Sequence, residues 1–248
     1  IVGHSVDIDK NCQRVLCSNE DGALHVFPDL LQLLTLDARV AVLKVMDTSS
    51  LELKPLIAKY KAMPKMPQPD DIKKVINQLG STLLDKLMAR MDAFENLFVE
   101  QATCCKHHSK KCDVFPAALL QTDSERVAQV TGVAKLTDPL LIYMAGTSCQ
   151  DWSSMSQVLS LAGKTVLPFA VELQLIRRKR PHVYFHECTR NFRASILEKF
   201  LPGYRVHSMI QRPTERGFPI QRTRRYTACI RLDMELVRPI EEIKILDR

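Results

Sequence analysis

The chain has 248 residues, of which 46% are hydrophobic and 25% charged, with 13 Pro and only 8 Gly. This composition is typical of a globular protein and excludes collagen-like and disordered chains. Charged residues interrupt every apolar stretch before the roughly 18 residues that a membrane-spanning helix needs, so we expect no membrane span. The formal net charge of +7 favours a polyanionic partner only weakly, since a solvated basic surface gives the same balance.

The eight cysteines are scattered along the chain without the density of a disulfide framework. We therefore expect a reduced, intracellular protein. The sequence begins at Ile1 with neither an initiating Met nor a charged leader. We interpret it as a fragment of a longer chain, with no visible signal peptide.

The N-terminal half predicts a strand followed by helices. A β-branched stretch indicates a strand over residues 1–8, and apolar residues at helical spacing indicate a helix over 9–16. The same spacing recurs in a predicted helical insertion within residues 36–112. Its helices are expected over 38–46, 51–62 and 70–99, with a proline-rich linker over 63–69.

The C-terminal half alternates between strand and helix patterns. Strands are expected over 139–145, 182–185, 204–210 and 225–232, and helices over 166–180 and 192–200. This alternation is typical of a mostly parallel sheet covered by helices. The predicted fold class is α/β.

Polar segments near the predicted strand ends are the candidates for chemistry, because ligands of a parallel sheet bind beyond its carboxyl edge. Cys149, Glu187 and the arginines Arg222 and Arg224 lie in such segments. Together they suggest a thiolate nucleophile, an acid and guanidinium groups that hold anions and lower the pKa of the thiol. Taken singly, each also fits a simpler explanation as a core cysteine, a capping acid or an exposed strand face.

Three of these segments resemble motifs of the cytosine-C5 DNA methyltransferase family, in the same order. Residues 148–153 resemble Pro-Cys-Gln-x-Phe-Ser, which carries the nucleophile of the family. Residues 187–189 resemble Glu-Asn-Val, and residues 217–226 resemble Gly-x-Pro-Gln-x-Arg-x-Arg-x-Phe. The altered residues of these motifs are similar to those of a divergent branch of the family, such as that of dinoflagellates among the protists.

The resemblance implies a Rossmann-like sheet of S-adenosylmethionine-dependent methyltransferases, with residues 1–248 as a partial catalytic domain. It implies that Cys149 attacks carbon 6 of a flipped-out cytosine and that Glu187 engages nitrogen 3 and the exocyclic amine. Arg222 and Arg224 would position base and backbone. The expected partner is DNA, which would explain the basic runs, and the expected location is the nucleus.

Two N-terminal segments are similar to the family's cofactor-binding segments. The resemblance implies that Asp7 binds the ribose of S-adenosylmethionine and that Ile8 packs on its adenine. Asp29 would approach the adenine amino group.

The chain also departs from the family pattern. The glycine-rich motif Phe-x-Gly-x-Gly is expected upstream of Ile1, and a recognition region is expected after Leu232. Ser148, Cys188 and Ile220 replace the usual Pro, Asn and Gln. Two alternatives therefore stay open: an inactive methyltransferase-like module that binds nucleic acid, and an RNA cytosine methyltransferase.

The insertion holds a further group of metal-ligand residue types. Cys105, His108 and Cys112 are spaced as zinc ligands can be, with Cys104 or His107 as a fourth. Because a four-ligand site normally uses two well-separated pairs, we favour a basic solvated loop with incidental cysteines and expect no metal.

Overall fold

The structure is a computed structural model that describes most of the chain. The described residues are 2–6, 10–18, 23–62, 70–102, 105–106, 108–113, 140–146, 150–153 and 159–234. Asp7, Ile8 and Cys149, which the sequence analysis selected, lie outside them.

The chain divides into two compact units, which are described separately. The first consists of Ile1–Lys44 with Ala89–Leu140, and the second of Val45–Met88 with Leu141–Arg248. The partial catalytic domain expected over residues 1–248 therefore spans both units.

The first unit contains a parallel β-α-β element. β1 (Val2–Val6) and β2 (Ala23–Phe27) pair in parallel, and α1 (Lys10–Ser18) lies between them in the chain. Val6 lies opposite Phe27 in the register. Because the strands are parallel, their carboxyl ends lie at the same edge. The strand and helix predicted over 1–16 are confirmed, whereas β2 was not predicted.

Short elements complete the first unit. A 3-10 turn, η1 (Leu30–Leu33), follows β2, and β3 (Gln101–Ala102) pairs antiparallel with β4 (Cys112–Asp113). A hydrophobic cluster in this unit has four buried members: Phe27, Leu33, Cys105 and Cys112.

α2 (Leu36–Ala62) is one continuous helix where the sequence predicted two, over 38–46 and 51–62. The polar residues 47–50 between these patterns are helical as well. Ser49 in this stretch is buried, so tertiary packing overrides the weak local helix preference of the polar run.

α3 (Asp70–Asp92) ends before the predicted end at Val99. Beyond it the backbone turns to bond with an earlier segment. The amide of Thr35 donates to the carbonyl of Leu97 at 3.0 Å, and the amide of Val99 donates to the carbonyl of Leu33 at 2.8 Å. These long-range bonds replace the helical ones that the apolar spacing predicted.

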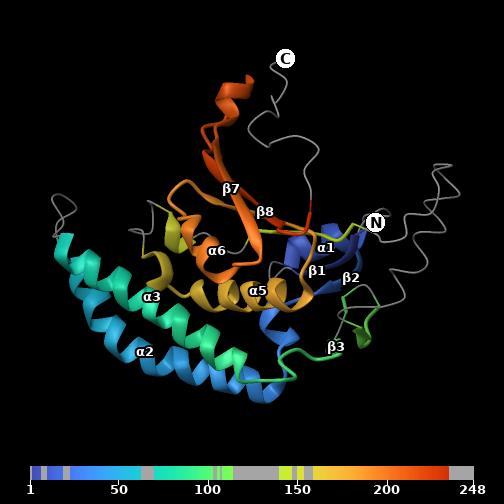
Figure 1. Ribbon diagram of the computed structural model, residues 1–248, viewed down its shortest axis with the longest axis horizontal. Helices are drawn as coiled ribbons and strands as arrows, with labels where there is room; N and C mark the ends of the chain where they lie inside the picture. The colour runs from blue at the N-terminus through green and yellow to red at the C-terminus, as the bar shows by residue number, and fades with distance from the viewer. Residues whose placement is uncertain are drawn as a thin grey trace, which may run out of the picture. The chain divides into compact units, whose positions relative to one another are not determined.

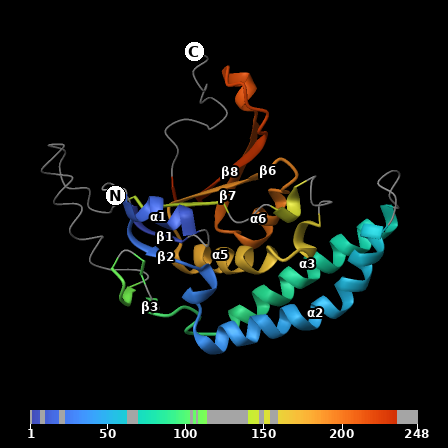
Figure 2. The ribbon, with the colours of Figure 1, turned by 180° about the vertical axis from the view of Figure 1, so that it is seen from behind.

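Within the second unit α2 and α3 lie side by side (Figure 1 and Figure 2). α3 approaches η4 (Ser160–Ala162) so closely at Gly80 that a Cβ there would lie 2.6 Å from the Ala162 nitrogen. Among the described helices, none combines the length and the apolar character needed to cross a membrane.

The second unit contains a four-stranded mixed sheet. Its order is β5 (Ile142–Ala145), β6 (Val183–Thr189), β8 (Arg224–Arg231) and β7 (Tyr204–Gln211). β5 and β6 are parallel, whereas β8 is antiparallel to both of its neighbours. The fold class α/β is confirmed, but the prediction of a mostly parallel sheet is wrong for these strands.

The direction of β8 follows from its connection to β7. Residues 212–223 join the two strands and contain only the 3-10 turn η5 (Pro213–Arg216). A parallel pair is usually joined by a crossover α-helix, and residues 212–223 contain none, so this connection favours an antiparallel pair.

Helix α5 (Val166–Lys179) packs on one face of this sheet, and α6 (Ser195–Phe200) precedes β7. The alternation along β6 places Tyr184 and His186 on the covered face, where both are buried. The Tyr184 hydroxyl donates to the carboxylate of Glu172 in α5. Phe185, on the opposite face, is exposed.

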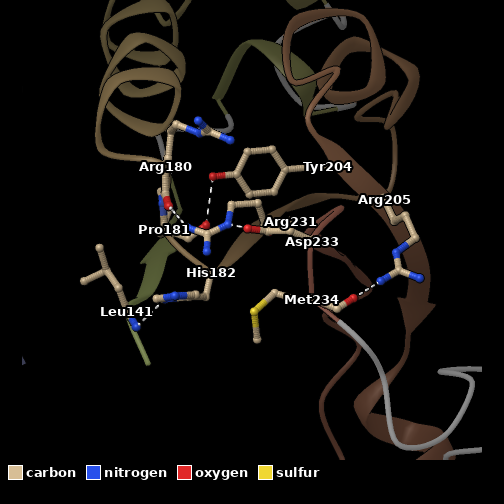
Figure 3. Close-up of polar contacts among 9 residues, drawn as sticks. All are labelled: Leu141, Arg180, Pro181, His182, Tyr204, Arg205, Arg231, Asp233 and Met234. Carbon is tan, nitrogen blue, oxygen red and sulfur yellow. Dashed lines mark hydrogen bonds and ion pairs between the residues drawn. The ribbon is translucent and has the colours of Figure 1, made fainter. Parts of the chain in front are cut away.

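The corner between α5 and β6 is fastened from two neighbouring strands (Figure 3). Arg180 ends the helix with φ 48°, in the left-handed region. Its carbonyl accepts a hydrogen bond from Arg231 Nη1 at 2.8 Å, and the carbonyl of Pro181 accepts one from the Tyr204 hydroxyl at 2.8 Å. Asp233 in turn pairs with Arg231 Nε at 2.6 Å, which lowers the pKa of Asp233.

His186 lies among aromatic rings. Its ring centroid is 4.5 Å from that of Phe192 and 5.7 Å from that of Phe169. Among the described residues, neither of its nitrogens has a hydrogen-bond partner. Burial lowers the pKa of His186 to about 4, so the ring is neutral at physiological pH.

We expect the substitution Arg180→Gly to stabilise the protein by roughly 0.5 kcal/mol. A side chain in the left-handed conformation costs about 1–2 kcal/mol, which Gly avoids. Gly also makes the unfolded chain more flexible, which costs about 0.5–1 kcal/mol on folding. The carbonyl of residue 180 still accepts the hydrogen bond from Arg231. Urea unfolding measures the difference. The matched control Arg178→Gly, inside the same helix, should lower stability by about 1 kcal/mol. A loss of stability in Arg180→Gly would contradict the argument.

We expect His186 to make the protein less stable in acid. Between its unfolded pKa of about 6.5 and its folded pKa of about 4, the unfolded chain binds a proton that the folded chain does not. The free energy of unfolding should therefore fall as pH falls through this window, by up to about 3 kcal/mol. In His186→Phe this part of the pH dependence should vanish. If the free energy of unfolding changes equally with pH in the unmodified protein and in His186→Phe between pH 7.5 and 4, His186 is not the source of the pH dependence.

Candidate active site

The carboxyl ends of β5 and β6 form a rim in the second unit where polar side chains meet. The strands are parallel and Ala145 lies opposite His186. The residues that follow each of them, Gly146 and Glu187, therefore lie next to each other at the same edge. We call Gly146, Glu187 and Arg224 the carboxyl-edge rim.

Glu187 lies inside β6, whereas the sequence analysis placed it after the strand. The predicted strand ended at Phe185, but β6 continues to Thr189 because it pairs with β8 up to the pair Thr189 and Arg224. This longer strand fixes the backbone of Glu187 on both sides. Its side chain projects on the face opposite to the buried His186.

Glu187 and Arg224 form an ion pair on this face. Arg224 Nε lies 2.8 Å from Glu187 Oε1. The side chain of Arg224 is 21% exposed and that of Glu187 is 33% exposed. Arg224 Nη1 also donates to the carbonyl of Thr223 at 3.1 Å, which holds the guanidinium in place. The partly buried carboxylate thus lies beside a cation that is itself held by the backbone.

Gly146 allows the carboxylate to lie against the end of β5. A Cβ at this position would be 3.2 Å from Glu187 Oε2 and 3.6 Å from the Glu187 carbonyl oxygen. Any larger residue would press on the carboxylate. One oxygen of Glu187 therefore meets Arg224 and the other faces the backbone of Gly146.

The segment that follows Cys149 is anchored to the end of β6. The 3-10 turn η2 (Gln150–Trp152) begins at the next residue. The carbonyl of Trp152 accepts hydrogen bonds from Thr189 Oγ1 at 3.1 Å and from Asn191 Nδ2 at 3.0 Å. The residues on both sides of 147–149 in the sequence are therefore fastened to the carboxyl end of β6.

Asp151 fastens the same turn to the start of α5. Its Oδ2 accepts hydrogen bonds from the Thr165 amide at 2.9 Å and from Thr165 Oγ1 at 2.7 Å. Gly163 is required beside it, since a Cβ there would overlap the Asp151 carboxylate at 1.9 Å. Asp151 thus has a structural role, holding the backbone that follows Cys149.

The basic run before and within β8 divides between two faces. Arg225 points away from the rim, and its Nη1 donates to Ser208 Oγ at 3.0 Å. Arg222 is exposed and forms no ion pair within the described part of the chain. Of the two arginines that the sequence analysis selected, the structure brings only Arg224 to Glu187.

The proposed cofactor residues belong to the first unit. Asp29 follows β2, and its Oδ1 accepts a hydrogen bond from the Leu31 amide at 2.9 Å, capping η1. Asp7 and Ile8, which come directly after β1 in the sequence, lie outside the described residues. Since β1 and β2 are parallel, the Asp29 carboxylate is held near the edge at which both strands end.

The first unit also contains a basic pocket that the sequence analysis missed. It is lined by five residues: Lys10, Gln13, Arg14, Cys17 and Lys106. Lys10 and Arg14 are four residues apart on α1 and so share one helix face. The spacing of Lys10 and Arg14 could have predicted a basic helix face, but Lys106 is distant in the sequence and its place beside that face could not be predicted.

Four metal-ligand side chains converge in the first unit: His25, Cys105, His108 and Cys112. Their donor atoms all lie within 4.8 Å of one another. Cys105 and Cys112 are buried, which differs from the solvated loop that we expected. Cys104 and His107, the expected fourth ligands, lie outside the described residues. His25 of β2 was not predicted, because nothing in the sequence links it to a segment so far along the chain.

Comparison with models of protein families and with curated protein sequences finds no match for this chain. The resemblance to cytosine-C5 methyltransferases therefore rests on the motifs in residues 148–153, 187–189 and 217–226.

Proposed function

We propose that the chain belongs to a catalytic domain that transfers a methyl group from S-adenosylmethionine to carbon 5 of cytosine in DNA. One observation carries the proposal. An acid oriented by an arginine, Glu187 with Arg224, lies at the carboxyl edge of two parallel strands. The described residues on either side of the candidate nucleophile Cys149 in the sequence, Gly146 and Trp152, contact residues at the end of β6.

Glu187 suits the polar edge of a cytosine. A carboxylate accepts a hydrogen bond from the exocyclic amine, and a protonated carboxyl group donates one to nitrogen 3. Both interactions need the carboxyl group to be held in place, and the ion pair with Arg224 and the close approach of Gly146 restrict its position. Proton donation to nitrogen 3 draws electrons from the ring and makes carbon 6 electrophilic.

Cys149 then supplies the nucleophile. Its thiolate adds to carbon 6, and the electron pair of the ring double bond moves to carbon 5 as nitrogen 3 takes the proton. Carbon 5 forms a bond to the methyl group, which leaves its sulfonium sulfur. A base removes the proton from carbon 5, the electron pair of that bond re-forms the double bond between carbons 5 and 6 and expels the thiolate, and nitrogen 3 returns its proton to Glu187. The net products are 5-methylcytosine, the demethylated cofactor and one proton.

The methyl donor supplies an electrophilic methyl group, and we assign its binding to Asp7, Ile8 and Asp29. The described residue of this set fits the role. Asp29 carries a carboxylate that accepts hydrogen bonds and is oriented by the Leu31 amide, as a group that binds an adenine amine must be. Asp29 follows β2, which is parallel to β1. Nucleotide-like ligands of α/β sheets bind beyond the carboxyl ends of parallel strands.

DNA is the partner that the charges of the protein support. Arg177, Arg178 and Lys179 are exposed in the last turn of α5, and Arg222 is exposed before β8. Phosphate contacts of such side chains supply much of the affinity for nucleic acid. A DNA substrate in turn accounts for the proposed nuclear location.

We expect Cys149→Ser to abolish a covalent adduct between the protein and DNA that contains 5-fluorocytosine. The fluorine cannot leave as a proton does, so the reaction stops with carbon 6 bonded to sulfur. Denaturing electrophoresis in the presence of S-adenosylmethionine measures the adduct. The control Cys12→Ser, at an exposed position, should keep it. An adduct that persists without the Cys149 thiol would exclude Cys149, and adducts with RNA alone would favour an RNA substrate.

We expect Glu187→Gln to lower the methylation rate by roughly 100-fold or more, because the amide cannot donate a proton to nitrogen 3 at the same position. Arg224→Gln should lower the rate by on the order of 10-fold, since it frees the carboxylate to turn. Initial rates at saturating DNA measure both effects. Arg212→Gln, an exposed arginine paired with Glu215, serves as the control and should not change the rate. Equal rates for Arg224→Gln and Arg212→Gln would show that Arg224 has no role in the reaction.

A further inference from the structure

We propose that His25, Cys105, His108 and Cys112 bind one zinc ion that stabilises the first unit. Two thiolates and two imidazoles form a common ligand set of structural zinc sites. The four donor atoms lie within 4.8 Å of one another and come from two parts of the chain: His25 from β2, and Cys105, His108 and Cys112 from the stretch that ends in β4. The convergence of His25 with the other three is not imposed by sequence neighbourhood.

The distances fit a tetrahedral zinc ion. His108 Nδ1 lies 3.5 Å from Cys105 Sγ and 3.5 Å from Cys112 Sγ. With zinc bonds of about 2.3 Å to sulfur and about 2.0–2.1 Å to nitrogen, a tetrahedron has sulfur-to-nitrogen edges of about 3.6 Å. The ring centroids of His25 and His108 are 5.1 Å apart at an interplanar angle of 53°, so the two imidazoles approach from different directions.

The backbone around Cys105 is preorganised for a metal ligand. The Val26 amide points at Cys105 Sγ at 3.4 Å, and such amide-to-sulfur bonds stabilise a thiolate. The Ser109 amide donates to the Cys105 carbonyl at 2.8 Å, and the Cys105 amide donates to the Lys110 carbonyl at 2.9 Å. Together these bonds close the turn that carries both Cys105 and His108.

The surroundings indicate a structural site. Cys105 and Cys112 are buried against Phe27 and Leu33, where a thiolate needs a cation to balance its charge. Four protein ligands complete the coordination of zinc and leave no position for a substrate. His108 is exposed, which gives the ion a route of entry.

The ion would join segments that are distant in the sequence. Val26 and Cys105 are 79 residues apart, and β2 is otherwise joined to this turn by few bonds, such as that from the Lys106 amide to the Val26 carbonyl at 2.7 Å. A link that closes so long a loop restricts the unfolded chain strongly. Zinc would therefore hold the turn and β4 against the parallel pair of β1 and β2.

The competing explanation is a disulfide between Cys105 and Cys112. It accounts for the two buried cysteines but not for His108, whose Nδ1 is equally distant from both sulfurs. It also gives no role to the imidazole of His25 in the same cluster. The experiment must therefore distinguish a metal from a disulfide.

The test is the metal content of the protein purified with zinc under reducing conditions, followed by replacement of zinc with cobalt(II). We expect one zinc per chain, and for cobalt the intense visible bands of a tetrahedral site with thiolate charge transfer. Cys105→Ser, His25→Asn and His108→Gln should each lower the affinity at least tenfold, whereas the exposed control Cys12→Ser should not change it. His108→Gln changes an exposed side chain, so its fold can be verified by circular dichroism.

Alkylation of the unmodified protein provides a second measurement that does not depend on any variant. Zinc should slow the alkylation of Cys105 and Cys112 at least tenfold and leave that of Cys12 unchanged. A protein without stoichiometric zinc, a Cys105–Cys112 disulfide in the reduced preparation, an octahedral cobalt spectrum or unchanged affinity in His108→Gln would each overturn the proposal. Methylation is not measured, so failure here would leave the proposed function unaffected.

Discussion

The parallel pairing of β5 with β6 is the constraint on which the candidate active site depends. Because both strands end at one edge, Gly146 meets Glu187, although about 40 residues separate them in the chain. The antiparallel insertion of β8 then brings its first residue, Arg224, to the same edge. Three segments with no sequence proximity thus supply a small residue, an acid and a cation at one place. Reversal of either strand would send one of these groups to the other end of the sheet.

Two neighbouring residues of β6, His186 and Glu187, face different environments because side chains alternate between the two faces of a strand. His186 faces the aromatic cluster and is neutral because burial lowers its pKa to about 4, whereas Glu187 faces the open side and lies beside Arg224. A shift of the register by one residue would bury the carboxylate and expose the imidazole. The buried pair of Tyr184 and Glu172 fastens the covered face to α5 and opposes such a shift. The core therefore determines which side chains are available for chemistry.

Local patterns in the sequence were enough to predict α5, β7 and β8 within one residue at each end, because their apolar spacing is uninterrupted. Long-range pairing was not predictable in this way. β6 extends to Thr189 because β8 pairs with it, and the connection before β8 lacks the helix of a parallel crossover. Of the candidate site, the sequence identified Glu187 and Arg224 from their place near predicted strand ends, and the motif resemblance then gave each of them an expected role. It missed Gly146 and His25, since the role of each depends on a residue that is distant in the chain.

The two units solve the problem of stability by different means. The second unit buries a continuous apolar layer around α5, with Leu173, Leu175 and Ile176 fully covered, and this layer alone can support its sheet. The described hydrophobic cluster of the first unit contains two cysteines among its four buried members. Thiols contribute less apolar area than leucine or phenylalanine, so this cluster gains less from burial. A metal held by the same cysteines would add to the stability of this cluster, since a bound ion stabilises the folded state by its binding free energy. The unit that we assign to the cofactor would then gain from zinc as well as from its buried apolar residues, such as Val26, Val42 and Leu97, whereas the carboxyl-edge rim lies in the other unit.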